Sequence, residues 1–173
     1  DDTWIFSFDF SSNTGSWTNV TDRLHNNHPS KRNCIAMASA GNGMAMLFGG
    51  GTVATSAANT FGSQTAFQDL GDTWLFWLDE NDEPHWYGST CGTEGVVQVT
   101  PPQGRSGKSL SSVISDDGTP TFIMYGGFVS SAFGLEINKA VSQFWTITVG
   151  CPQGTYFERS SRKCVDCPRG FFS

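Results

Sequence analysis

Three short segments contain residue types that could bind a metal ion or a phosphate. His25 and His28 lie close together, residues 79–83 are rich in carboxylates, and residues 106–109 read Ser-Gly-Lys-Ser. Each pattern is incomplete: the histidines have no third ligand nearby, and the acidic run lacks the spacing of a calcium loop. The Ser-Gly-Lys-Ser segment lacks the first glycine and the following helix of a phosphate-binding loop. We therefore expect no catalytic residues, no metal site and no cofactor.

The last part of the chain contains a cysteine pattern. Cys-Pro-x-Gly begins at Cys151 and again at Cys167, followed within two residues by an aromatic residue, and Cys164 lies between them. So short a segment cannot form its own core and is typically held by disulfides. A zinc site is the alternative, although it would lack a fourth ligand. The pattern resembles the small cysteine-rich repeats of ephrin-receptor type, which occur in tandem in extracellular proteins.

This resemblance implies a separate C-terminal module over residues 151–173. It also implies that Cys151 bonds to Cys164 and that Cys167 bonds to a residue beyond the segment. In the rest of the chain, we expect Cys34 and Cys91 to form a second bridge, the alternative being that Cys34 is a free buried thiol.

One glycosylation sequon is present, Asn19-Val20-Thr21. Its asparagine becomes a glycan acceptor in a secreted protein. Together with the cysteines, the sequon predicts an extracellular or cell-surface location.

Composition excludes two classes of partner. The net charge is −6, and no cluster of Lys and Arg is available to neutralise phosphates, so a nucleic-acid partner is not expected. No apolar stretch is long enough to span a membrane. Aromatic residues make up 13% of the chain and Gly is frequent, which favours an all-β fold with many turns.

Three features recur along the chain in one fixed order. Asp2-Thr3-Trp4 returns as Asp72-Thr73-Trp74, with a looser copy at Phe144-Trp145. An arginine that follows a proline recurs as Arg32 and Arg105. Three large apolar residues precede Gly-Gly at Gly49-Gly50 and again at Gly126-Gly127. Recurrence in a fixed order predicts a repeated structural unit.

The unit is predicted to contain four antiparallel strands, because runs of four to eight aromatic and β-branched residues are bounded by turn residues. In the complete middle copy the strands are expected at about 34–40, 44–49, 73–78 and 85–88. Two strands at 3–10 and 16–21 precede this copy. Three strands at 106–115, 121–126 and 141–148 follow it.

This order of features resembles the kelch repeat of β-propellers. The resemblance covers residues 1–150 and implies an all-β segment of a kelch-type propeller with four-stranded antiparallel blades. The unit is about 70 residues long, whereas the kelch repeat has about 50. We place the excess in long loops at 51–71 and 89–103. The residues expected to hold the motif structurally are Gly49, Gly50, Trp74, Trp86, Gly126, Gly127 and Trp145.

The predicted strands make about two and a quarter blades, whereas a propeller closes with about four to eight. The outer blades would therefore expose apolar faces. Further blades, from the same polypeptide or from neighbouring subunits, are the expected partners.

The expected function is a non-enzymatic extracellular module for protein interaction, adhesion or structural assembly, such as part of a filament or flagellar hair. The long loops could bind a protein or glycan ligand through four apolar residues, Phe61, Phe67, Phe133 and Leu135. The alternative is a fragment of a secreted kelch-fold enzyme of oxidase type, whose active site lies outside this segment.

Overall fold

A computed structural model describes residues 2–24, 28–41, 43–54, 66–89, 102–114, 120–129, 139–148, 155–158, 163–166 and 168. Within these ranges the chain forms antiparallel β-strands and one short 3-10 helix, η1 (Thr21–Arg23). The prediction of an all-β fold is therefore confirmed. The strands are β1 (Trp4–Asp9), β2 (Thr14–Asn19), β3 (Ala36–Gly41), β4 (Met44–Ala54), β5 (Ala66–Leu78), β6 (Pro84–Ser89), β7 (Ser109–Ile114), β8 (Pro120–Tyr125), β9 (Phe128–Val129), β10 (Lys139–Ala140), β11 (Phe144–Thr148), β12 (Thr155–Glu158) and β13 (Lys163–Asp166).

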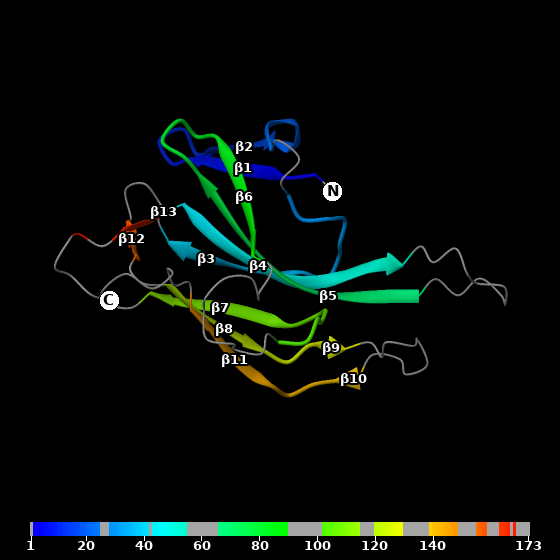
Figure 1. The fold of residues 1–173 in the computed structure, drawn as a ribbon. Helices are drawn as coiled ribbons and strands as arrows, with labels where there is room; N and C mark the ends of the chain where they lie inside the picture. Colours follow the sequence, from blue (N-terminus) through cyan, green and yellow to red (C-terminus); the bar gives the residue numbers. More distant parts are fainter. Residues whose placement is uncertain are drawn as a thin grey trace.

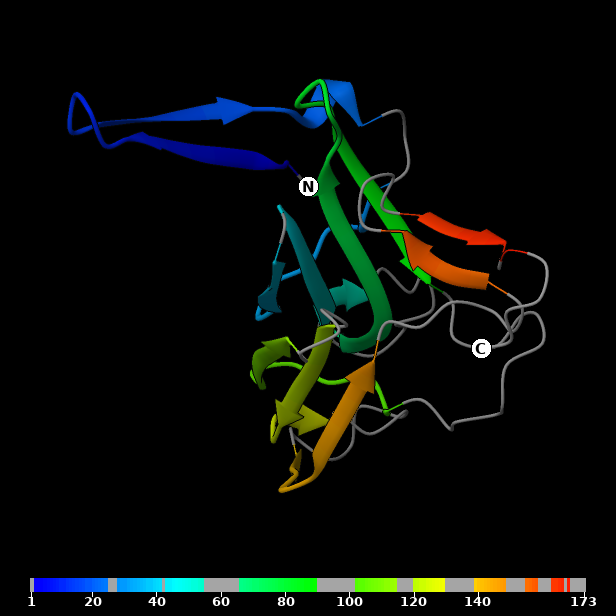
Figure 2. The same ribbon diagram turned by 90° about the vertical axis from the view of Figure 1, so that its left-hand side faces the viewer.

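The first sheet is the hairpin β1–β2, which projects away from the other strands (Figure 2). Its turn is stabilised by Asp9, whose carboxylate accepts hydrogen bonds from Ser11 and Ser12. Asn13 has a φ of 54°, a left-handed conformation that asparagine tolerates better than most residues. Asp9 and Asn13 thus explain why the chain reverses here.

The second sheet has four strands in the order β3-β4-β5-β6 (Figure 1). Gly41 and Gly43, with φ of 75° and 72°, form the turn between β3 and β4. Asp79 forms the turn between β5 and β6, because its Oδ1 accepts the backbone N–H groups of Asn81 and Glu83. The four-stranded middle unit predicted from the sequence is confirmed.

The third sheet has the order β11-β8-β7, and the short strands β9 and β10 pair beside it. Two, four and three strands therefore follow one another in the chain, in the order expected from the repeated features. The hairpin β12–β13 lies in the C-terminal segment. Among the described residues, no helix is long and apolar enough to cross a membrane.

The middle sheet is covered on both faces, because successive side chains of a strand point to opposite sides. Met46 of β4 is fully buried and packs with Phe122 of β8, in the interface with the third sheet. Its neighbour Leu47 packs on the other face with Leu24 and Trp86. The middle and third sheets thus stack face to face, and a separate apolar cluster covers the other face of the middle sheet.

One predicted boundary was wrong. The loop expected at residues 51–71 is strand at both of its ends, because β4 continues to Ala54 and pairs with β5 from Ala66 onward, while residues 55–65 lie outside the described residues. The pairing passes a bulge between Phe48 and Gly50. The β-branched pair Thr52-Val53 favours continued pairing beyond it. Phe67, expected in a loop, therefore lies in β5.

Candidate functional site

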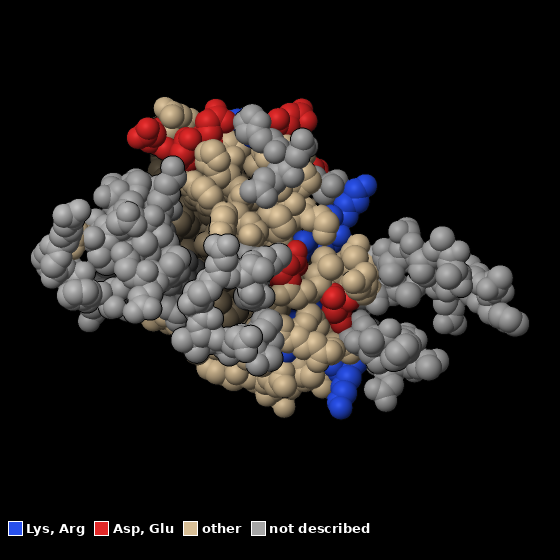
Figure 3. Space-filling view, viewed as in Figure 1, with Lys and Arg blue, Asp and Glu red and all other residues tan. Residues whose placement is uncertain are grey.

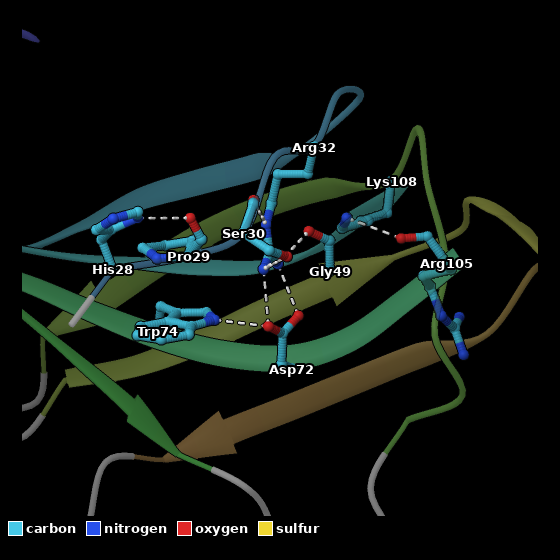
Figure 4. Close-up of polar contacts among 9 residues, drawn as sticks. All are labelled: His28, Pro29, Ser30, Arg32, Gly49, Asp72, Trp74, Arg105 and Lys108. Atoms are coloured by element: carbon cyan, nitrogen blue, oxygen red, sulfur yellow. Dashed lines mark hydrogen bonds and ion pairs between the residues drawn. The ribbon is translucent and has the colours of Figure 1, made fainter. Parts of the chain in front are cut away.

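A network of hydrogen bonds joins the strands of the middle unit around Arg32 (Figure 4). Its guanidinium donates to both carboxylate oxygens of Asp72, at 2.6 and 2.8 Å, and to the carbonyl oxygen of Gly49 at 3.1 Å. The indole of Trp74 donates to the same carboxylate at 2.6 Å. Only 4% of the Arg32 side chain is exposed. The arginine thereby fastens the segment before β3 to the Gly-Gly turn and to β5.

The third unit repeats this network around Arg105. Its guanidinium donates to the carbonyl oxygen of Gly126 at 3.3 Å and to Oε1 of Gln143 at 2.9 Å. The indole of Trp145 donates to the same Gln143 oxygen at 3.4 Å. In the first unit, Trp4 likewise donates to Asp2 at 2.7 Å. The residues of the repeated motif therefore occupy equivalent structural positions.

The two glycine pairs also occupy similar surroundings. Gly49 and Gly50 have φ of 55° and 107°, and Gly126 and Gly127 have φ of 71° and 105°. A Cβ on Gly50 would lie 2.7 Å from the carbonyl oxygen of Asn33, and one on Gly127 would lie 2.9 Å from that of Ser106. A side chain larger than hydrogen would therefore clash at both second positions.

The charges of these networks differ. Burial raises the pKa of Asp72, but hydrogen bonds from Arg32 and Trp74 more than offset it, so the pKa lies below its ordinary value. Burial lowers the pKa of Arg105, whose side-chain partner is the neutral Gln143. The network around Arg32 in the middle unit is an ion pair. The network around Arg105 in the third unit is a hydrogen bond from a buried cation to a neutral amide.

Lys108 is a second buried cation in the interface between the middle and third sheets. Its Nζ donates to the carbonyl oxygen of Arg105 at 2.9 Å and lies 5.5 Å from the centre of the Phe48 ring. Burial lowers the pKa of Lys108 to about 8, although the charge of Asp69 acts in the opposite direction. These contacts link the two sheets, and the side chain is too enclosed to meet a solvent ligand.

A cleft of about 320 Å³ lies between the start of β1 and the middle sheet. Trp4, Met37, Phe76 and Trp86 supply apolar walls, and Arg32 lies at its polar part. A second hollow of about 400 Å³ shares Trp4, Met37 and Phe76 with the first. Asp2, His28 and Ser30 lie in the lining of the first hollow beside Arg32, so this hollow combines apolar walls with polar and charged groups.

The hairpin β1–β2 presents an exposed aromatic face. Trp4, Phe6 and Phe8 alternate along β1, so they share one side of it, and Trp17 lies opposite Phe6 on β2. The Phe6 and Trp17 rings are 5.0 Å apart, and Trp17 is 66% exposed. We call these four residues the aromatic face.

The third sheet presents another open face. Tyr125 of β8 is paired with Phe144 of β11, so both point to the same side, and Val113 of β7 lies on that side as well. All three side chains are more than half exposed. Val113, Tyr125 and Phe144 define what we call the open face.

In Figure 3, most of the described surface is neither acidic nor basic, and acidic side chains gather mainly at one end.

The predicted disulfides find no support in the described residues. Cys34 carries a free, exposed thiol. Its expected partner Cys91, and also Cys151 and Cys167, lie outside the described residues. Cys164 lies in β13, where only its backbone is described. The bridges therefore stay predictions.

The remaining predicted site residues have mixed outcomes. Asn19 is exposed at the end of β2, where a glycan could project. Phe61, Phe133 and Leu135 lie outside the described residues, and of Phe67 only the backbone position in β5 is described. The predicted interaction loops therefore stay predictions.

Sequence reasoning missed one structural feature of the candidate site, the contact between each arginine and the residue two positions before the strand tryptophan. The recurrence of Arg32 and Arg105 was the available signal.

Among the described residues, no group of three or more His, Cys, Asp or Glu could hold a metal ion. The sequence matches no protein-family model and no curated protein.

Proposed function

We propose that this chain is a non-enzymatic extracellular module for protein interaction and assembly, built from kelch-like propeller blades and followed by a small cysteine-rich segment. The observation that carries this proposal is the open face on the third sheet. Val113, Tyr125 and Phe144 are 54%, 52% and 64% exposed on one side of a sheet whose other side is buried. Exposed apolar side chains gathered on one side of a sheet are typical of an interaction surface.

The interface between the middle and third sheets indicates which kind of partner could cover the open face. The middle sheet buries its Met46 face against the third sheet through Phe122, and the third sheet repeats the same strand order. A further sheet of the same kind, from the same polypeptide or from a neighbouring subunit, is therefore the proposed partner of the open face. The repeated networks around Arg32 and Arg105 support the kelch-like character of the units.

The extracellular location is supported by the sequence, which combines five cysteines with one sequon. The long ribbon of β4 and β5, and the interaction loops predicted from the sequence, are the proposed surface for a protein or glycan ligand.

The test is association of the purified chain through the open face. Sedimentation velocity over a range of concentrations is expected to show complexes larger than a monomer, because exposed apolar side chains leave water on association. Tyr125→Lys should abolish these complexes. Tyr87→Lys is the matched control, since Tyr87 is similarly exposed, at 58%, but lies on the edge strand β6. A chain that stays monomeric at every concentration, or that loses association equally in both variants, would contradict the proposal.

A further inference from the structure

Asn19 lies on the same side of the hairpin β1–β2 as the aromatic face. It is paired with Trp4 across the two strands, just as Trp17 is paired with Phe6. Trp17 and Asn19 are two positions apart in β2, so their side chains leave the same side of the strand. The sequon asparagine is therefore flanked by one tryptophan along its own strand and by another on the neighbouring strand.

The aromatic rings on this side are open to solvent. Trp4, Phe6 and Trp17 are 49%, 51% and 66% exposed. Their rings form a broad apolar platform, and the negatively charged faces of such rings attract polarised C–H groups. The ring of a sugar has one side rich in C–H groups and many hydroxyls at its rim. It can therefore cover a tryptophan and keep its hydroxyls in water.

The Asn19 amide is held in one orientation. Its Oδ1 accepts the backbone N–H of Thr21 at 3.0 Å, and the Thr21 hydroxyl accepts the backbone N–H of Thr3 at 2.9 Å. An asparagine held to the backbone two residues ahead in this way forms an Asx turn. Since Oδ1 is held toward the backbone, Nδ2, the atom that would bear a sugar, is directed by the same contact.

We propose that Asn19 carries an N-linked oligosaccharide whose first sugar packs on Trp17 and Trp4 and so covers the aromatic face. This proposal rests on the proposed extracellular function, because the modification occurs on the secretory route. In the transfer, Nδ2 attacks C1 of an oligosaccharide joined to a lipid diphosphate. The new C1–N bond forms, the C1–O bond to the diphosphate breaks, the lipid diphosphate leaves, and Nδ2 loses one proton to a base.

A structural consequence follows for assembly. A glycan that lies over Trp17 occupies the space that a further sheet would need on this side of the hairpin. Additional units would then join the molecule at the open face of Val113, Tyr125 and Phe144, which is on the third sheet. The hairpin β1–β2 and the third sheet would then have different roles, the first shielded by sugar and the second available to protein.

The first experiment measures occupancy. The chain is secreted from a eukaryotic host, and its intact mass is compared before and after removal of N-linked glycans. We expect a single glycan, lost completely in Asn19→Gln and retained in Thr21→Ser, which preserves the sequon. Secretion of folded chain with Asn19 unmodified would overturn the proposal.

The second experiment tests the contact with the aromatic face. The glycan is trimmed to a single N-acetylglucosamine, and nuclear Overhauser contacts are sought between its acetyl methyl group and the indole rings. The trimmed protein should melt at a higher temperature than the same sequence produced without glycan in a host that lacks N-glycosylation, and Trp17→Ala should remove this difference. Phe8→Ala is the matched control, because Phe8 is on the same face but opposite Gly15, far from Asn19.

The outcomes separate this inference from the proposed function. A glycan without contacts to Trp17 or Trp4, or a melting difference that survives Trp17→Ala, would refute the packing. Association that depends on Trp17 instead of the sugar would show that another sheet covers the aromatic face. Failure of self-association through Tyr125 would contradict only the proposed function, since Asn19 occupancy is measured independently.

Discussion

Arg32 and Asp72 lie 40 positions apart in the sequence and meet through two parallel hydrogen bonds of 2.6 and 2.8 Å. The equivalent pair in the next unit, Arg105 and Gln143, meets through one hydrogen bond of 2.9 Å. Both arginines also hold the carbonyl oxygen of the first glycine of a Gly-Gly pair. The same fastening of three chain segments is thus achieved once with an ion pair and once with a neutral amide.

Loss of the Asp72 charge should destabilise the fold. In Asp72→Asn the nearly buried Arg32 loses its anionic partner, and a charged hydrogen bond of this kind is worth about 2 kcal/mol. Urea unfolding at neutral pH measures the change in the free energy of unfolding. Asp22→Asn, on the short helix η1, is the control and should have almost no effect.

The same variant should change the pH dependence of stability. The folded pKa of Asp72 is below its ordinary value of 3.8, so its contribution is complete above that pH and is lost as the pH falls through the folded pKa. The difference between the native chain and Asp72→Asn should therefore shrink as the pH is lowered from 5 toward 2. A difference that stays constant over this range would contradict the assignment.

Gln143→Glu should stabilise the third unit. The substitution places a carboxylate where Arg105, fully buried, now meets an amide oxygen, and so reproduces the ion pair of the middle unit. We expect a gain of about 1 kcal/mol in the free energy of unfolding. Gln103→Glu introduces the same charge on an exposed side chain near Arg105 and should give a smaller change. A loss of stability in Gln143→Glu would show that the site cannot accept a charge.

Lys108 should make the fold more stable at alkaline pH. Its folded pKa of about 8 lies below the ordinary 10.5, so the folded state binds fewer protons than the unfolded state between these values. Stability attributable to this residue therefore rises as the pH rises from 8 to 10.5. In Lys108→Met this rise should disappear, while stability at pH 7 should be equal or higher because a buried charge is replaced by an apolar chain of similar length. Lys31→Met, which replaces an exposed lysine, should leave the increase in stability between pH 8 and 10.5 unchanged.

Alanine should be tolerated differently at the first glycine of each pair. A Cβ at Gly49 would lie 2.7 Å from the carbonyl oxygen of Leu70 and 2.8 Å from that of Arg105, whereas at Gly126 the nearest atom is 3.5 Å away. Gly126→Ala should cost about 1 kcal/mol for its positive φ alone, and Gly49→Ala at least about 3 kcal/mol. Thermal unfolding of both variants measures the difference, and equal costs would contradict the close approach at Gly49.

Much of the fold could be predicted from local patterns. Aromatic and β-branched runs bounded by turn residues identified the strands, and their recurrence predicted groups of two, four and three strands. Boundaries were less predictable, because a hairpin such as β4–β5 can continue wherever two backbones stay aligned. The β-branched pair Thr52-Val53 favours an extended backbone, but residue type alone does not tell a paired strand from an extended loop. The propeller closure, the disulfides and the loop contacts stay predictions.

The candidate site could be predicted only in part. Asn19 and the glycine pairs were identified by type and spacing, and so was the recurrence of Arg32 and Arg105. That Arg32 binds Asp72 could not be inferred, because the two residues are 40 positions apart and their contact depends on how distant segments pack. The exposure of Tyr125 beside the burial of Met124 was also inaccessible, since both are large residues in one strand.

The sequence by itself determined the all-β class, the order of strands and the places where only glycine fits, because these depend on backbone conformation and on neighbours close in the chain. The tertiary structure alone decided which face of each sheet is covered, which charges meet, and that Asn19 shares a surface with Trp17 and Trp4. Those properties arise when distant segments pack, and packing depends on the register and stacking of whole sheets.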